Sequence, residues 1–206
     1  IDNTFSLFNP FTTIEHISNK MQFDPPTQET ERICRSLIGS KTIISYRTIK
    51  SDGEIISGEL DNTNIVGDSM ENILYECIHK QIPSFEKGPK QASPDFYNSK
   101  IWEWELKCFT GSPNFDISNF NSYISQLNDN LKKKMYLTQY LVFKYKLIGG
   151  VLTIEDFKLC KIWEILSYNN KYPVSVQVKK LFWYNIRPCS FNQMKDCFEN
   201  EENNKT

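Results

Sequence analysis

The alternation of apolar and polar positions predicts several strands along this chain. Residues 41–60 alternate on both sides of Ser51-Asp52-Gly53, a pattern typical of a hairpin with glycine at its turn. Residues 136–148 are rich in aromatic and β-branched side chains and end at Gly149-Gly150. Further strands are expected at 93–97, 101–109 and 174–186.

Apolar residues three or four positions apart predict helices in other parts of the chain. The clearest helix is 67–82, where Asp68 is a candidate N-cap and Glu71 is its capping-box partner. One face of this helix would carry Met70, Ile73, Leu74, Cys77 and Ile78. The remaining assignments are helical pieces within 1–38 broken at 23–27, a loop at 83–92, and helices at 117–131 and 154–166.

The order of these elements predicts one α/β domain over residues 1–206, with a mixed β-sheet flanked by helices. Residues 1–65 would form an N-terminal region of helix and hairpin. Residues 66–188 would form the core of the domain, and residues 199–206 a frayed tail.

The composition excludes some kinds of site. None of the six cysteines is spaced as CxxC, and the two histidines, His16 and His79, stand far apart, so we expect neither a zinc site nor a histidine-based hydrolase. Free thiols in the cytoplasm are the expectation that follows. No apolar run approaches the roughly 18 residues of a membrane span, so no membrane partner is expected. The formal net charge of -1 neither indicates nor excludes nucleic acid, because metal-holding carboxylates would balance phosphate-binding lysines.

Charged residues interrupt the predicted strand 101–109 on one face only. Its other face carries the two tryptophans, so Glu105 and Lys107 point together towards a cleft or solvent, with Glu103 beside them. Asp95 follows Pro94 on the preceding segment. Mg²⁺ prefers oxygen ligands, which Asp95, Glu105 and the carbonyl of Leu106 would supply. Lys107 would then lie beside the metal, where it could assist the attacking water or neutralise charge on a phosphate.

Pro94-Asp95 and Glu105-Leu106-Lys107 resemble the motif of the PD-(D/E)xK nuclease superfamily. Upstream, residues 66–74 resemble the helix start found in the MutH-like mismatch endonuclease and in several type II restriction enzymes. Downstream, residues 177–188 resemble the closing segment of NgoBV-type restriction endonucleases. The resemblance covers residues 66–188 and implies a restriction-endonuclease-like core in which Glu71 is a further acidic ligand.

The resemblance implies a type II restriction endonuclease. Such an enzyme would hydrolyse phosphodiesters of double-stranded DNA at a specific sequence with Mg²⁺, leave 5′-phosphate ends, and act as a homodimer. The metal would be held by Asp95, Glu105, Leu106 and Glu71, and Lys107 would assist the water. Candidate DNA-contacting residues are Gln177, Lys179, Arg187 and Lys134.

Several alternatives stay open at this point. Glu71 could be only a capping-box residue, and Gln177 and Lys179 could form an ordinary exposed strand face. Lys134 could simply end a helix, and Arg187 could have a structural role beside Pro188. The function could instead be that of a strand-nicking or structure-specific repair nuclease, an RNA nuclease, or a DNA-binding protein on an inactive nuclease scaffold.

Overall fold

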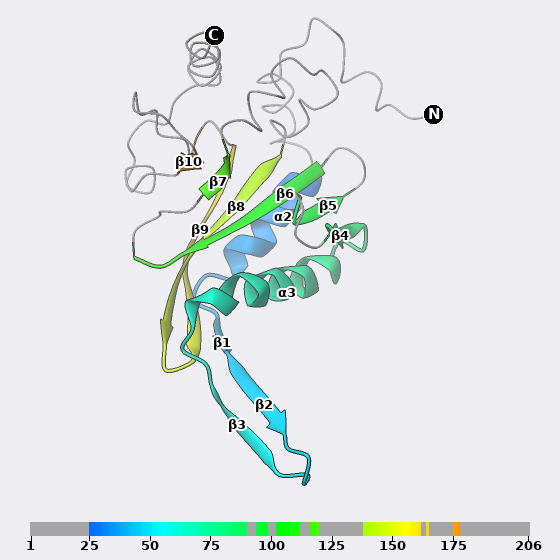
Figure 1. Cartoon of the computed structure of the whole chain (residues 1–206). Coiled ribbons are helices and arrows are strands. Elements are labelled where there is room, and N and C mark those ends of the chain that lie inside the picture. Colours follow the sequence, from blue (N-terminus) through cyan, green and yellow to red (C-terminus); the bar gives the residue numbers. More distant parts are fainter. Residues whose placement is uncertain are drawn as a thin grey trace, which may run out of the picture.

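A computed structural model describes residues 25–89, 94–98, 102–111, 116–119, 138–161, 164 and 175–177. Its centre is a six-stranded sheet in the order β1-β9-β8-β6-β5-β4 (Figure 1). Strands β6 and β8 are parallel, whereas the other neighbouring pairs are antiparallel, so the predicted mixed sheet is confirmed. The strands are β1 (Lys41–Ile43), β4 (Phe85–Lys87), β5 (Phe96–Asn98), β6 (Trp102–Phe109), β8 (Gln139–Ile148) and β9 (Val151–Lys161).

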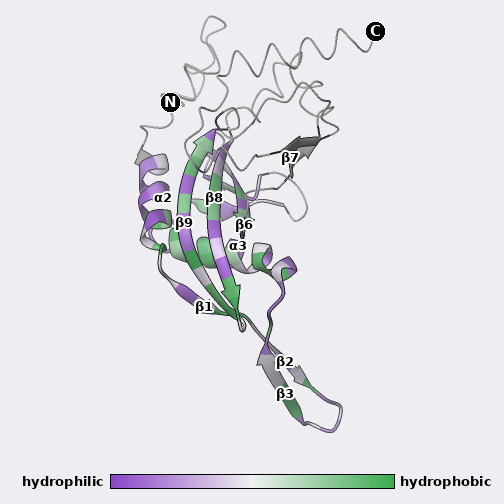
Figure 2. Ribbon diagram, turned by 90° about the vertical axis from the view of Figure 1, so that its left-hand side faces the viewer, coloured by the Kyte–Doolittle hydropathy of each residue, from purple (hydrophilic) through white to green (hydrophobic). Residues whose placement is uncertain are grey.

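Helices α2 (Pro25–Ser36) and α3 (Val66–His79) pack with the sheet into one core. Both helices lie beside the long strands in Figures 1 and 2. The tryptophan face of β6 is the core face, as predicted, because Trp104 and Leu106 belong to this core. Complete burial of one large apolar side chain contributes about 1.5–3 kcal/mol. The largest fully buried side chains are Trp104, Phe85, Phe96, Phe143, Phe157, Ile33, Met70, Leu74 and Ile78.

The apolar stripe of α3 is confirmed, but its predicted start is wrong. The helix begins at Val66, with Ile65 as an N-cap that makes no side-chain hydrogen bond, so Asp68 lies in the first turn and caps nothing. The reason lies upstream: the Asn62 carboxamide oxygen accepts the backbone N–H of Asn64, at 2.9 Å between N and O. That bond starts the 3-10 turn Thr63–Ile65, which runs directly into the helix.

The predicted hairpin around Gly53 is confirmed. Strands β2 (Ser45–Ile49) and β3 (Ile55–Glu59) pair antiparallel and extend away from the six-stranded sheet (Figures 1 and 2). Gly53 has a φ of 87°, which favours glycine. We call this hairpin, residues 45–59, the arm; nearly all of its residues are exposed.

The helix predicted at 154–166 is wrong over 154–161, because Val151–Lys161 is strand β9. Glu164 is helical, and residues 162, 163, 165 and 166 lie outside the described residues. Gly149 and Gly150, with φ of 52° and 71°, form the two-residue turn that joins β8 to β9. The pairing register then shifts, so that Glu155, between Ile154 and Asp156, stands opposite no residue of β8. This bulge separates the buried residues Ile154 and Phe157 by three positions, which imitates helical spacing.

Two other assignments need correction. The helix predicted at 117–131 conflicts with strand β7 (Asp116–Asn119), which pairs with β10 (Ser175–Gln177). The loop predicted at 83–92 contains β4, whose Phe85 is fully buried against the Phe96 ring. Strand β10 agrees with the start of the last predicted strand. The assignments that lie outside the described residues are the helical pieces before residue 25, the rest of 117–131, residues 178–186 and the tail 199–206.

The described cysteines are free thiols, as predicted: Cys34, Cys77, Cys108 and Cys160. Burial raises the pKa of Cys34 and of Cys108, so neither thiol is prepared to react as a thiolate. Cys189 and Cys197 lie outside the described residues. Within the part of the chain that the structure describes, no helix is long and apolar enough to cross a membrane.

Candidate active site

The pairing of β5 with β6 brings Asp95 to Glu105. Phe96 lies opposite Trp104 in this antiparallel pair, so Asp95, immediately before β5, falls beside Glu105. The backbone N–H of Leu106 donates to Oδ2 of Asp95, at 2.6 Å between N and O. Two carboxylates that are ten positions apart in the sequence therefore meet at one place on the sheet.

Glu105 and Lys107 lie on the same face of β6, as the alternation predicted. The Lys107 ammonium donates to Oε1 of Glu105, at 3.0 Å between Nζ and the oxygen. Only 20% of the Lys107 side chain and 13% of the Glu105 side chain are exposed. The other carboxylate oxygen of Glu105, Oε2, is buried and has no hydrogen-bond partner. Burying a carboxylate oxygen without a partner costs free energy, and a bound cation would offset that cost.

The surroundings of Asp95 disfavour its negative charge unless a cation lies beside it. Burial, followed by repulsion from Glu105, raises the pKa of Asp95 from about 3.8 to about 6. The hydrogen bond from Leu106 and the charge of Lys107 oppose this rise, whereas Glu71 adds to it. A hard divalent cation would remove the repulsion between the two carboxylates, so these residues fit such an ion.

Glu71 on α3 is close enough to influence Asp95, but it is held by another residue. Its Oε1 lies 3.3 Å from Nζ of Lys87 on β4. The same ammonium donates to Oδ1 of Asn72 at 2.5 Å and lies 5.4 Å from the centre of the Tyr75 ring. Among the described residues, no group of three or more His, Cys, Asp and Glu side chains is arranged to hold a metal ion. Asp95 and Glu105 alone would therefore need backbone, water or substrate oxygens to complete a metal site.

The candidate DNA-contacting residues are not brought to this site by the described structure. Gln177 lies in β10, and its side chain is outside the description. Lys134, Lys179 and Arg187 also fall outside the described residues. Glu103, on the same face as Glu105, accepts a hydrogen bond from the Thr138 hydroxyl at 3.4 Å between oxygens.

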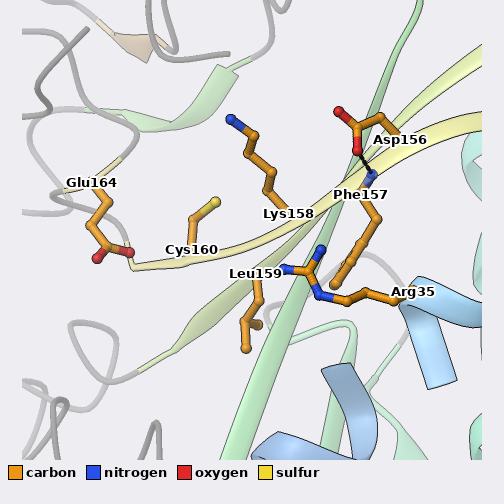
Figure 3. A pocket seen from close by; sticks show the side chains of 7 residues that line it. All are labelled: Arg35, Asp156, Phe157, Lys158, Leu159, Cys160 and Glu164. Atoms are coloured by element: carbon orange, nitrogen blue, oxygen red, sulfur yellow. Dashed lines mark hydrogen bonds between the residues drawn. The ribbon is translucent and has the colours of Figure 1, made fainter. Parts of the chain in front are cut away.

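A hollow of about 390 Å³ lies elsewhere, on strand β9. In the sheet order, β8 separates β9 from β6, so this hollow is not the acidic site. Figure 3 shows Arg35 reaching from α2 towards Phe157, and its guanidinium lies 5.7 Å from the ring centre. The lining residues are Arg35, Asp156, Phe157, Lys158, Leu159, Cys160 and Glu164.

Lys87 is not among the residues that the sequence predicts for the site, because the pattern of residues 83–92 indicates a loop. The only signal was the short stretch Phe85-Glu86-Lys87, in which an aromatic residue alternates with charged ones. Three residues are too few to distinguish a strand from a turn by alternation. The strand is identified by the burial of Phe85, which depends on partners distant in the sequence.

Comparisons with known proteins agree on one family. The model of the NgoBV restriction endonuclease family matches residues 35–204. The type II restriction enzyme NlaIV of Neisseria lactamica is 31% identical over 172 residues, which are 77% of this chain and 68% of that enzyme. A solved structure of NlaIV restriction endonuclease has a TM-score of 0.64 at 22% identity, covering 84% of this chain and 77% of that chain. This likeness confirms the expected α/β fold.

Proposed function

This chain belongs to the NgoBV restriction endonuclease family and is a type II site-specific deoxyribonuclease, and we propose that it cuts double-stranded DNA with Asp95, Glu105 and Lys107. One observation carries the assignment of these residues. Glu105 has one buried oxygen without a partner, its other oxygen accepts from the ammonium of Lys107, and its charge acts on the carboxyl of Asp95. Two carboxylates and a lysine, largely removed from water, are suited to metal-assisted hydrolysis of a phosphodiester.

Membership of such a family implies a divalent metal ion, and we propose Mg²⁺. Asp95, Glu105 and the carbonyl of Leu106 would hold it, and Glu71, whose Oε1 is paired with Lys87, would complete the acidic set through its other carboxylate oxygen. When bound, the ion supplies Lewis-acid stabilisation and makes a coordinated water more acidic. Asp95 would enter the site as a carboxylate, because a cation reverses the repulsion that raises its pKa.

Lys107 acts on the water and on the phosphate. Its ammonium is held by Glu105 on the site face of β6, so it need not be reoriented before reaction. It orients the attacking water and donates hydrogen bonds to phosphate oxygens as negative charge develops on them. Attack in line with the leaving 3′ oxygen leaves 5′-phosphate ends.

A homodimer acting in the cytoplasm is part of the proposal. The described part of one chain presents one such acidic site, and cutting both strands of a symmetric sequence takes two sites related by a two-fold axis. Free thiols at Cys34, Cys77, Cys108 and Cys160 are usual for proteins of a reducing compartment.

The test is digestion of a sequenced phage DNA by the purified protein. With Mg²⁺ we expect discrete fragments with 5′-phosphate ends, with EDTA no cutting, and with Ca²⁺ binding without cutting. Glu105→Gln removes the charge of the Glu105 carboxylate and keeps its shape, so it should yield no fragments while folding normally. Wild-type fragments from Glu105→Gln would refute the site, and nicks in place of double-strand cuts would refute the dimer.

A further inference from the structure

We infer that Lys87 and Gly88, two consecutive residues at the end of β4, are positioning residues that hold Glu71 and Asp95 in the site. Neither touches the reacting atoms in this account. The inference rests on the proposed roles of Asp95 and Glu71. It adds a third element, the short edge strand β4, to α3 and the β5–β6 pair that supply the acids.

Gly88 fixes the backbone that carries Asp95. Its N–H donates to the carbonyl oxygen of Asp95, at 2.7 Å between N and O. A Cβ on Gly88 would lie 1.7 Å from the carbonyl oxygen of Pro94 and 2.8 Å from its carbonyl carbon. These are backbone atoms, so no side-chain rotation could relieve the overlap. Only glycine lets the chain approach Pro94-Asp95 this closely, and any larger residue must move the strand that begins just after Asp95.

Lys87 holds Glu71 in place through contacts of its side chain with α3. Its ammonium lies 3.3 Å from Glu71 Oε1 and donates to the side-chain oxygen of Asn72 at 2.5 Å. It also lies 5.4 Å from the centre of the Tyr75 ring, so three residues of one helix surround it. The backbone of Lys87 pairs with Phe96, the residue after Asp95. Lys87 therefore joins the helix that carries Glu71 to the strand that follows Asp95.

This arrangement suits a site that must keep negative charges together. Glu105 and Glu71 both lie close enough to Asp95 to repel its carboxylate. Lys107 offsets that repulsion from β6, and Lys87 offsets it from β4. A residue behind a metal-binding carboxylate typically changes metal affinity or activity about 10- to 100-fold when it is replaced. A displacement of about 1 Å in a reacting group can itself cost about 100-fold in rate.

The experiment compares each positioning residue with a matched control. Gly88→Ala is paired with Gly67→Ala on α3, where an added Cβ meets nothing within 4 Å. Lys87→Met is paired with Lys50→Met, because Lys50 also forms an ion pair with a glutamate but lies on the arm. Lys87→Arg tests whether another positively charged side chain at this position restores the contact with Glu71. Each protein is assayed for the single-turnover cleavage rate of phage DNA across Mg²⁺ concentrations, for DNA binding in Ca²⁺, and for thermal unfolding.

Gly88→Ala should cut about 100-fold more slowly and need more Mg²⁺ for half its maximal rate, with DNA binding in Ca²⁺ unchanged. Lys87→Met should lose about tenfold in rate at saturating Mg²⁺, and Lys87→Arg should recover most of it. Both controls should match the wild type. If Gly88→Ala does not fold, the Lys87 series decides alone.

Wild-type rates and Mg²⁺ dependence in Gly88→Ala and Lys87→Met would overturn the inference, provided that Glu105→Gln is inactive. Cutting by Glu105→Gln would instead overturn the proposed function itself. A loss of DNA binding equal to the loss of rate would also contradict a positioning role.

Discussion

Two lysine–glutamate pairs in this molecule lie on antiparallel ribbons and have different consequences. On the arm, Lys50 pairs with Glu54, and 43% and 58% of their side chains are exposed. On β6, Lys107 pairs with Glu105, and the exposed fractions are 20% and 13%. The arm pair is well hydrated, so it contributes about 0–1 kcal/mol and perturbs little. The second pair is largely removed from water, where charges interact more strongly, and both of its members act on the carboxyl of Asp95.

The difference depends on what surrounds each ribbon. The strands at the site are backed by Trp104, Phe85 and Phe96, all fully buried. Among the residues that the structure describes, none gives the arm such backing, and its isoleucines Ile49 and Ile55 are 66% and 51% exposed. The charged cluster that we propose as the active site differs from the arm because a core holds its backbone in place and keeps water away from one side of it.

The largest difference is expected from removing each lysine. Lys107→Ala should lower the cleavage rate about 10²- to 10⁴-fold, since a positioned donor to the water and phosphate is lost. Lys50→Ala should cut at the wild-type rate. Fragment formation on one phage DNA at saturating Mg²⁺ measures both variants, and equal losses in the two would remove the distinction between the pairs.

Truncating a ring behind the site should cost the most stability. Phe96→Ala should lower the free energy of unfolding by about 3–5 kcal/mol, because the ring is fully buried against Phe85. Denaturant unfolding followed by tryptophan fluorescence measures the change. A cost below about 1 kcal/mol would mean that the β4–β5 end is not packed as described.

A pH-dependent effect should follow the charge of Asp95 in the metal-free protein. Its pKa is about 6 in the folded protein, above its ordinary value, so folding is favoured while Asp95 is protonated. That stabilisation is complete below about pH 4 and is lost as the pH rises through about 6. Asp95→Asn has no charge to bury, so at pH 8 it should exceed the wild type in stability by on the order of 1–2 kcal/mol, allowing for partial solvent exposure.

Denaturation in EDTA at a series of pH values tests this effect. The excess stability of Asp95→Asn should shrink as the pH falls from about 6 to about 4. An excess that does not change with pH would mean that the carboxyl is not destabilised by its neighbours.

The smallest effect is expected on the arm. Ile49→Ala should change the free energy of unfolding by no more than about 0.5 kcal/mol, because 66% of the residue is already exposed. The same denaturation assay, run at low protein concentration, compares it with Phe96→Ala. A cost that approaches that of Phe96→Ala would show that the arm is covered in solution.

The sequence predicted the part of the site that local rules determine. Alternation along β6 placed Glu105 and Lys107 on one face, and antiparallel pairing with β5 brought Asp95 to them. Lys87 could not be found in this way, because β4 is three residues long and exists through burial of Phe85. Its place near Glu71 depends on packing between a helix and an edge strand, which no local pattern encodes.

The error at β9 has a related cause. The helical spacing comes from Leu159, Ile162, Trp163 and Leu166, and the last three of these lie beyond β9, outside the described residues. Within β9, the bulge at Glu155 adds to the ambiguity by placing the buried Ile154 and Phe157 three positions apart. The glycines at 149 and 150 were the better signal, since two positive φ angles in a two-residue loop favour a hairpin. At this place a pair of glycines typical of a hairpin turn is a better indicator of structure than the spacing of apolar residues.

The measurement that tests the central claim most directly is DNA cleavage by Asp95→Asn and Asp52→Asn. The two variants make the same change, one beside Glu105 and one at the tip of the arm, where Asp52 accepts the backbone N–H of Glu54. Both proteins should fold, and asparagine can accept the same hydrogen bonds. We expect wild-type fragments from Asp52→Asn and none from Asp95→Asn in Mg²⁺. Fragments from Asp95→Asn at the wild-type rate would contradict the account.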